Sequence, residues 1–293
     1  MRLFNKFEVG YWNVGVIEQP ISHIMKGESY SIRWLEHRYK DRFFADPFLL
    51  RVDNRYYFFL AEELEFTRYK GVIVLLTVEK ATMQLVDRRV VVDDDFHLSY
   101  PFVVNQTVLP ENHKSGRLHA FGIDREPVEK WVVLDFPLID PTLLRFNDTW
   151  WIFGTTKDDP NRNLSIFYEK DGRFVPHKKN PVKVDSRSSR PGGSFFWYNG
   201  ELYRPAQNCE RRYGENINIM KINRLDEEDF DEEFCFQVSS RGSSRFNLGL
   251  HTFNVYDDFV LVDGYERSIQ IREKIRIKVA DVKRSLQKAG DER

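Results

Sequence analysis

The chain has 293 residues, enough for one large domain or two average ones. Its 44 Lys and Arg nearly balance its 45 Asp and Glu, and this net charge of −1 argues against a nucleic-acid-binding protein that relies on a positive surface. Aromatic residues make up 15% of the chain, which excludes disorder for most of it and is typical of packed β-sheets.

The N-terminal segment, residues 1–40, carries no uninterrupted apolar stretch of the kind that a secretion signal requires. It precedes the first recognisable repeat, so we expect a short extension that packs on the main domain. A short helical pattern covers residues 38–43. Because no apolar run anywhere is long enough to cross a membrane, we also expect no transmembrane segment and a cytoplasmic protein.

An internal repeat begins at Asp46. Residues 46–59, DPFLLRVDNRYYFF, align without a gap with residues 140–153, DPTLLRFNDTWWIF. The two copies share Asp, Pro, Leu, Leu, Arg and the final Phe, and a Tyr pair in one matches a Trp pair in the other. Each copy has an apolar run, a polar turn and an aromatic-rich run, which predicts a β-hairpin.

Weaker copies of this hairpin occur at residues 99–111, 190–205 and 249–265, so that five units begin near residues 46, 100, 140, 190 and 251. Apolar segments between them supply a third and a fourth strand, among them residues 71–80, 117–123, 164–170 and 217–223. Four short strands repeated at this spacing are typical of a propeller blade. The sequence therefore predicts an all-β protein, a five-bladed β-propeller with blades of about four antiparallel strands, over residues 41–280.

The residues after the last hairpin contain two patterns. Residues 269–279 alternate Ile, Ile, Glu, Ile, Ile and Val at every second position, which predicts a late strand at the ring closure or its edge. Residues 278–293 have helical periodicity, and we expect residues 281–293 to form a C-terminal tail. We interpret the basic segment from Arg267 onward as a solvated edge in preference to a membrane contact.

The first strand of each propeller blade runs along the central axis, so the residues that start the five units should converge. Those residues are Asp46, Tyr100, Asp140, Arg190 and His251. Two converging carboxylates can divide the roles of base and acid at a glycosidic bond, and we assign these roles to Asp46 and Asp140. An Asp-Pro dipeptide that only forms a turn is the alternative for either residue alone.

Glutamates end the second strands of the first two blades, Glu62 and Glu63 in one and Glu111 in the other. We expect one of them to reach the axis. Glu111 is favoured as a further catalytic acid because Pro110 stiffens the chain before it. Solvated turn carboxylates are the alternative.

The predicted substrate-binding residues are Tyr100, Arg190, Arg204, Gln207 and His251, whose side chains can hold hydroxyls, carboxylates or phosphates. An Arg190 that pairs internally with the aspartate of the first or third blade is the alternative. His251 fits a hydrogen-bonded core histidine better than a metal ligand, although a divalent cation or a water beside it stays open. The two cysteines are too few for a disulfide framework or a zinc site, and no cofactor is expected to be required.

The segment FFADPFLLRVDNRYYFF resembles the first blade of glycoside hydrolase family 43 and related five-bladed enzymes, in which such an Asp-Pro carries the catalytic base. That resemblance implies the base role for Asp46. The second and third blades depart from it, with Tyr100 where those hydrolases have a pKa-tuning Asp and Asp140 where they have a Glu general acid.

A longer resemblance runs from about residue 10 to residue 265, through WNVGVI, ADPFLL, HLSYPFV, LPE, DPTLL, RPGG, RPAQNC, YG and GLHTFN. These segments are similar to the N-terminal propeller domain of plant glucosamine inositolphosphorylceramide transferases and of bacterial polysaccharide-locus proteins. The resemblance implies a sugar or nucleotide-sugar ligand and a glycosyltransferase as a partner.

Two functions follow as hypotheses. The first is a sugar-active enzyme that works by hydrolysis or glycosyl transfer at a glycosidic or glycosyl-phosphate bond, in intracellular polysaccharide or glycolipid metabolism. The second is a non-catalytic propeller that binds a glycan or nucleotide sugar and assists a separate glycosyltransferase. A propeller that only binds other proteins would not need the chemically active residues that start the five units.

Overall fold

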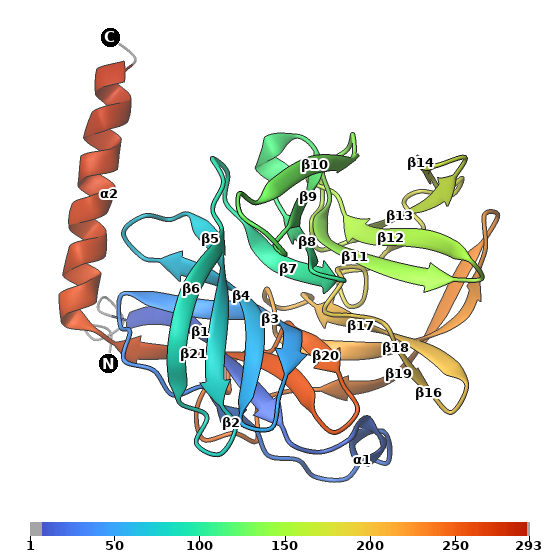
Figure 1. The fold of residues 1–293 in the computed structure, drawn as a ribbon, viewed down its shortest axis with the longest axis horizontal. Coiled ribbons are helices and arrows are strands. Elements are labelled where there is room, and N and C mark those ends of the chain that lie inside the picture. The colour runs from blue at the N-terminus through green and yellow to red at the C-terminus, as the bar shows by residue number, and fades with distance from the viewer. Residues whose placement is uncertain (1–7, 292–293) are drawn as a thin grey trace.

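Five antiparallel sheets surround one axis in the computed structural model, which describes residues 8–291 (Figure 1). This arrangement confirms the predicted five-bladed all-β propeller. The hairpins expected from the repeat form the two inner strands of each blade, so the starts of the five units lie around the axis as predicted.

The first four blades follow one another along the chain. The first contains β3 (Arg42–Val52), β4 (Tyr56–Glu65), β5 (Gly71–Glu79) and β6 (Leu85–Val92). The second contains β7 (Ser99–Val104), β8 (Thr107–Glu111), β9 (Leu118–Gly122) and β10 (Glu129–Leu134), with a 3-10 turn at His113–Ser115. The third contains β11 (Ile139–Phe146), β12 (Thr149–Thr155), β13 (Asn163–Lys170), β14 (Arg173–Pro176) and β15 (Lys183–Val184). The fourth contains β16 (Phe196–Tyr198), β17 (Glu201–Asn208), β18 (Asn216–Leu225) and β19 (Phe230–Val238).

The fifth blade joins the two ends of the domain. Its inner strands β20 (Phe253–Val255) and β21 (Val260–Ile269) come from the end of the propeller, and its outer strands β1 (Glu8–Ile17) and β2 (Arg33–Trp34) come from the beginning. The short helix α1 (Ile21–Met25) lies between these outer strands in sequence. The sequence predicts an extension at residues 1–40 that packs on the propeller; residues 1–7 lie outside the described residues, and residues 8–40 instead supply two strands of the ring.

The C-terminal segment is a helix where a strand was expected. Strand β21 ends at Ile269, and α2 (Ile271–Asp291) follows. The alternation that predicted a strand also repeats every fourth residue, at Ile271, Ile275 and Val279, and so fits a helix equally well. The helix expected at residues 38–43 is absent, since these residues lead into β3. No helix of the described chain has the length and apolarity needed to span a membrane.

Apolar side chains hold neighbouring blades together. A buried cluster lies at each of the blade junctions, for example Leu60 and Ile73 of the first blade against Val108 and Phe121 of the second. Fully burying one such side chain contributes about 1.5–3 kcal/mol. These clusters fix the blades relative to one another, and thereby fix the polar side chains that project to the axis.

Candidate functional site

Three residues at the axis owe their position to the same backbone feature. Asp46, Tyr100 and Asp140 each precede a proline in the inner strand of a blade, and their φ angles are 50°, 44° and 49°. At each of them the pairing register of the hairpin shifts. A bulge with a left-handed residue redirects a side chain, and the following proline needs no ladder partner for its nitrogen. The X-Pro dipeptide therefore aims these three side chains at the axis.

The bulges also free backbone N–H groups for bonds between blades. The N–H of Asp46 donates to Asp263 Oδ2 at 3.1 Å, and the N–H of Tyr100 donates to Asp46 Oδ2 at 3.2 Å. Each bond runs from one blade to a carboxylate of the blade before it in the ring. The acidic groups at the axis are thus positioned by backbone donors that the sheet itself does not use.

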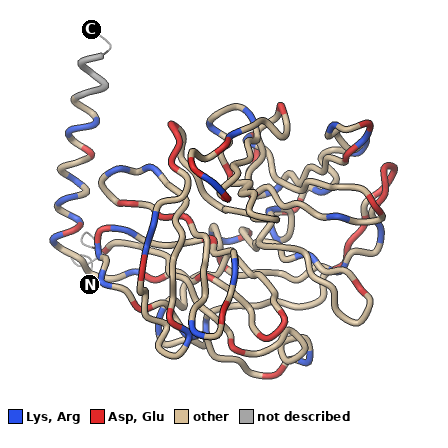
Figure 2. The backbone as a smooth tube through the Cα atoms, viewed as in Figure 1, with Lys and Arg blue, Asp and Glu red and all other residues tan. Residues whose placement is uncertain are grey.

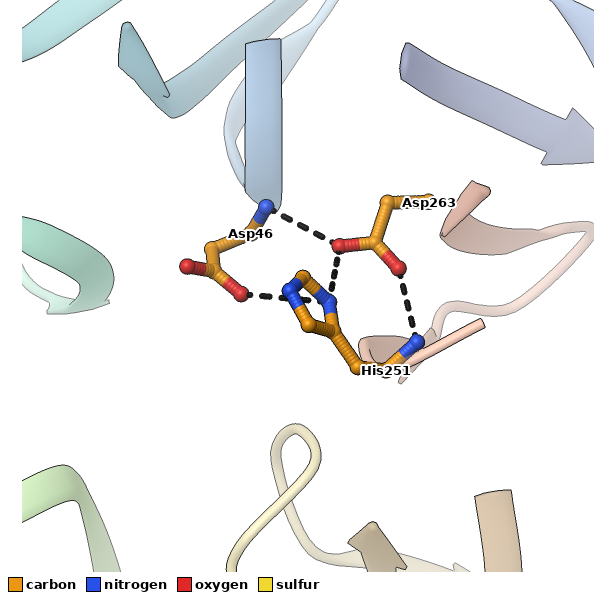
Figure 3. Close-up of side chains that lie close together, drawn as sticks. All are labelled: Asp46, His251 and Asp263. Atoms are coloured by element: carbon orange, nitrogen blue, oxygen red, sulfur yellow. Dashed lines mark hydrogen bonds and ion pairs between the residues drawn. The ribbon is translucent and has the colours of Figure 1, made fainter. Parts of the chain in front are cut away.

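Asp46, His251 and Asp263 form a buried triad (Figure 3). The Nδ1 of His251 lies 2.5 Å from Asp263 Oδ2 and 3.5 Å from Asp46 Oδ1. The imidazole stacks on the Trp12 ring, with a centroid separation of 3.7 Å. Thr252 Oγ1 donates to Asp46 Oδ1 at 2.8 Å. His251 is therefore held as a core histidine between two carboxylates.

The charges in this triad depend on one another. Burial disfavours the imidazolium, but the charges of Asp263 and Asp46 outweigh it and raise the pKa of His251 above its ordinary value. Burial raises the pKa of Asp46, and the positive charge of His251 opposes that rise. The pKa of His251 and the pKa of Asp46 are thus both raised, and the charge of each group depends on the charge of the other.

The same three residues can be tested as a metal site. Their donor atoms lie within 4.8 Å of one another. However, the 2.5 Å between His251 Nδ1 and Asp263 Oδ2 is shorter than the roughly 3 Å that separates two ligands of one ion with bonds of about 2.1 Å. Asp263 also accepts the N–H groups of His251 and Thr252 at 2.9 and 3.0 Å. These contacts fit a hydrogen-bonded ion pair better than a metal site.

Asp140 lies in a second group, with Arg190, Gln207 and Glu111. Arg190 Nε donates to Asp140 Oδ2 at 2.6 Å, and Gln207 Nε2 donates to the same oxygen at 2.7 Å. Arg190 Nη2 lies 3.8 Å from Glu111 Oε2. His113 Nδ1 lies 2.6 Å from the other Glu111 oxygen. Arg190 therefore pairs with the aspartate of the third blade and at the same time faces Glu111.

The two carboxyls of this group differ in protonation. Burial, together with the charges of Glu111 and Asp46, raises the pKa of Asp140 to about 8 in spite of Arg190. At Glu111 burial alone would raise the pKa, but the hydrogen bond from His113 and the charge of Arg190 outweigh it and lower the pKa to about 2. At neutral pH, Asp140 thus holds a proton and Glu111 is ionised. The sequence predicts an acid role for Glu111, and its lowered pKa makes it a weaker proton donor at neutral pH than Asp140.

Glu62 is a further buried carboxyl near these groups. It lies on β4 opposite Ala45, one residue before the bulge at Asp46. Burial and the charges of Asp46 and Glu111 raise its pKa well above the ordinary value. Its neighbour Glu63 points elsewhere and pairs with Arg42 at 2.7 Å. Of the three glutamates considered from the sequence, Glu62 and Glu111 therefore reach the axis.

Two predicted substrate-binding residues serve as internal ties. Arg204 is 1% exposed, and its Nε donates to Glu232 Oε2 at 2.8 Å, so it joins β17 to β19 away from the axis. The Tyr100 hydroxyl is 2.8 Å from Thr142 Oγ1 and accepts the N–H of Gly193 at 2.7 Å, and the residue has no exposed surface. The sequence predicts that these two side chains bind substrate. In the structure both are buried and connect neighbouring strands or blades instead.

Tyr213 is a candidate that the residue-by-residue reasoning missed. It lies on the loop after β17, is 46% exposed, and has the Arg190 guanidinium 4.8 Å from its ring centroid. The next residue, Gly214, has a φ of 61°, and a Cβ there would lie 2.9 Å from the Trp12 ring. Only glycine fits this close approach, and the Tyr-Gly dipeptide was the signal available in the sequence.

The sequence analysis also missed Asp263, although its position on the second strand of a blade is equivalent to those of Glu62 and Glu111. Glu62, Glu111 and Asp263 all lie on the second strand of a blade, and Glu62 and Glu111 pair with the residue just before a bulge. The central cluster is defined here as these three residues with Asp46, Asp140, Arg190 and His251. Its carboxylates are 0–6% exposed, and Tyr213 presents the adjoining open surface.

Comparison with known proteins identifies the family of this propeller. Residues 31–255 match the family model described as "Glucosamine inositolphosphorylceramide transferase 1, N-terminal". The chain belongs to this family. Glucosamine inositolphosphorylceramide transferase 1 of Arabidopsis thaliana is 32% identical over a 248-residue alignment that covers 76% of this chain and 32% of that protein. The protein of the same name from Oryza sativa subsp. japonica is 31% identical over 214 residues, covering 67% of this chain and 28% of its own length. The chain thus spans about a third of the length of these relatives.

Solved structures share the fold at low sequence identity. A family 117 glycoside hydrolase from Zobellia galactanivorans superposes with a TM-score of 0.51 at 10% identity, covering 91% of this chain and 92% of that one. A family 43 β-xylosidase/α-arabinofuranosidase from a compost metagenome gives 0.52 at 11% identity, covering 80% and 93%. These similarities establish a common propeller architecture.

Proposed function

We propose that this domain is a carbohydrate-active enzyme that acts at a glycosidic or glycosyl-phosphate bond. The observation that supports the proposal is that Asp46 and Asp140 start equivalent hairpins and converge on one axis, where the pKa of Asp140 is raised to about 8 and that of the neighbouring Glu111 is lowered to about 2. Glycosyl cleavage needs two carboxyls at one site, because one group must accept a proton while another donates one. The family name of the relatives supports a sugar substrate.

The residues divide the chemistry as follows. Asp46 accepts the proton of the attacking hydroxyl, which belongs to water in hydrolysis or to an acceptor in transfer. Asp140 donates its proton to the leaving oxygen. Until that step, the negative charge of Glu111 raises the pKa of Asp140 and so keeps the proton on it. Arg190 orients Asp140 and is the cation available to a phosphate leaving group. This scheme requires no metal or other cofactor.

The setting that fits this chemistry is intracellular synthesis of a polysaccharide or glycolipid. The plant relatives are named as transferases of an inositolphosphorylceramide, and this chain matches about a third of their length. Sugar transfer to a lipid-linked or polymeric acceptor is therefore the favoured reaction, with hydrolysis as the same chemistry on water.

A non-catalytic sugar-binding propeller that assists a glycosyltransferase is the second candidate. One observation favours it: Arg190 and Gln207 both donate hydrogen bonds to the same oxygen of Asp140, as expected for a carboxyl with a structural role. In this case the sugar would stack on the exposed ring of Tyr213, and the central cluster would hold the fold around that surface without taking part in a reaction.

The deciding experiment compares turnover and binding in matched variants. The native chain, Asp46→Asn and the control Asp258→Asn, an exposed turn aspartate, are assayed with 4-nitrophenyl glycosides and with UDP- and GDP-sugars. An enzyme predicts that Asp46→Asn loses about 100-fold or more of turnover and keeps its sugar affinity. Sugar binding without turnover in all three proteins would establish the binding role, and equal turnover in all three would remove Asp46 from the mechanism.

A further inference from the structure

Helix α2 projects from the rim of the propeller and extends beyond it (Figure 1). One face of the helix is anchored. Ile277 is 8% exposed and packs on Val9 and Phe66, and Arg284 donates to the carbonyl of Thr67 at 2.6 Å. With about 100° per residue, Ile277 and Arg284 lie on the same side of the helix.

The opposite side carries an exposed apolar stripe. Its members are Ile271, Ile275, Val279, Val282 and Leu286, which are 50–68% exposed. On a helix these positions fall within an arc of about 80°. Because the anchor lies on the other side, the stripe points away from the propeller. An apolar stripe of this length left in water indicates a docking surface.

Basic residues border the stripe along both edges. Lys274 and Lys278 lie along one edge, and Arg272 and Lys283 lie along the other. Arg272, Lys278 and Lys283 are exposed and have no acidic partner among the described residues. Figure 2 shows Lys and Arg on successive turns of the helix.

Between Arg272 and Leu286 the acidic residues are Glu273 and Asp281, and both lie outside the apolar stripe. Glu273 and Asp281 project toward the anchored side. Each is paired within the helix, Glu273 with Arg276 at 3.3 Å and Asp281 with Arg284. The charge next to the stripe is therefore positive along the helix from Arg272 to Lys283.

This arrangement argues against a second copy of the chain as the occupant. Two such helices that packed stripe to stripe would bring a basic edge against a basic edge, in either the parallel or the antiparallel orientation. Like charges at these flanking positions destabilise helix pairs. The occupant must instead combine an apolar interior with a negatively charged surface.

We propose that α2 docks on the surface of an anionic lipid bilayer. Amphipathic helices with a narrow apolar face and Lys or Arg along its borders lie in the membrane interface, where the apolar residues enter the acyl boundary. The basic side chains then reach the anionic headgroups while their aliphatic stems stay in apolar surroundings. The proposal rests on the helix alone and is independent of the chemistry at the propeller axis.

The test is flotation of the full chain with lipid vesicles. One set of vesicles contains phosphatidylcholine alone, and the other contains about three parts phosphatidylcholine to one part phosphatidylserine. We expect the chain to float with the anionic vesicles, not with the neutral ones, and to be released as the salt concentration rises toward about 1 M. Equal flotation with both sets, or with neither, would overturn the proposal.

Two helix variants and a matched control locate the contact. Ile275→Gln with Val282→Gln should weaken vesicle binding about tenfold or more. Arg272→Gln with Lys278→Gln and Lys283→Gln should weaken it about fivefold per residue. The control Val86→Gln with Val90→Gln makes the same apolar-to-amide change at exposed positions of β6 and should bind as the native chain does.

Folding of the variants is verified by their thermal unfolding temperatures, which should match that of the native chain because the changed side chains are exposed. Native vesicle binding by both helix variants would exclude α2 as the contact. Stripe-dependent self-association in sedimentation equilibrium, without vesicle binding, would replace the membrane with a second copy of the chain.

Discussion

Arg190 Nε lies 2.6 Å from Asp140 Oδ2, and the same guanidinium lies 4.8 Å from the ring centroid of Tyr213. One side chain thus connects the proton-holding carboxyl of the third blade to the exposed aromatic ring of the fourth. The buried carboxyl at the axis and the exposed ring are thus both in contact with Arg190.

The pKa of Asp140 gives a pH dependence of stability with a definite sign. Its value in the folded protein is raised to about 8, whereas an unfolded chain has an ordinary value of about 3.9. Between these values the folded state binds a proton that the unfolded state does not, so the free energy of unfolding should fall as the pH rises from about 4 to 8. In Asp140→Asn this fall should be smaller, as measured by urea unfolding at a series of pH values. An unchanged slope would show that Asp140 is ionised throughout.

Replacing Glu111 should shift the proton on Asp140. The charge of Glu111 is one of the causes that raise the pKa of Asp140, so Glu111→Gln should lower that pKa. Turnover that requires protonated Asp140 would then decline at a lower pH than in the native chain. The measurement is the pH profile of kcat/KM. Glu63→Gln is the control, because Glu63 pairs with Arg42 and Arg88 instead, and it should leave the alkaline limb in place.

Glu111 itself contributes to stability in the opposite pH range. Its pKa is lowered to about 2, below the ordinary value near 4.3, so its contribution is present above about pH 4 and is lost as the pH falls toward 2. Glu111→Gln should therefore be less stable than the native chain at pH 6 and should approach it in acid. A constant stability difference across about pH 2–6 would contradict this linkage.

Tyr213 is expected to form the platform for a sugar ring. Tyr213→Ala should weaken sugar binding about tenfold, whereas Tyr213→Phe keeps the ring and should bind nearly as the native chain does. Titration calorimetry of both variants, with whichever 4-nitrophenyl glycoside or nucleotide sugar binds the native chain, measures these affinities. If the alanine variant binds like the native protein, the sugar does not stack there.

Arg204 should matter for folding and not for chemistry. Arg204→Met removes one of the two cations that pair with the buried Glu232 and leaves only Lys183, so it should lower the free energy of unfolding, by less than the roughly 3–5 kcal/mol expected for a buried charge with no partner. The double variant Arg204→Met with Glu232→Leu should recover much of this loss. Turnover per folded molecule should stay unchanged in both. A selective loss of turnover in the folded single variant would restore Arg204 to the site.

From the sequence alone, the repeat predicted the propeller architecture and several of the side chains that converge at its axis. Asp46 and Asp140 begin two near-identical hairpins, so their convergence follows once the propeller is recognised. The sequence predicted substrate binding by both Arg204 and Gln207, but strand geometry argues against the pair, because the two residues lie an odd number of positions apart on β17. Successive side chains of a strand alternate between its faces, so only one of the two could point to the Asp140 side.

Other features depend on contacts that no local pattern records. Strand β1 carries no copy of the repeat, because it is an outer strand that completes a blade begun at the other end of the chain. The protonation of Asp140 and Glu111 depends on His113 and Arg190, which come from different blades. The position of α2 depends on the packing of Ile277 and on the contact of Arg284 with Thr67, within a sequence pattern that is also compatible with a strand.

The closure of the fifth blade uses strands that lie outside the segment matched by the family model. The family match ends at residue 255 and begins at residue 31, so it excludes both β1 and β21. A chain shortened to that match would lose two of the four strands of the blade, together with the Asp263 carboxylate that receives the backbone N–H of Asp46. In this propeller, the segment that the family model matches stops short, at both ends, of the two strands that pair with each other to close the ring.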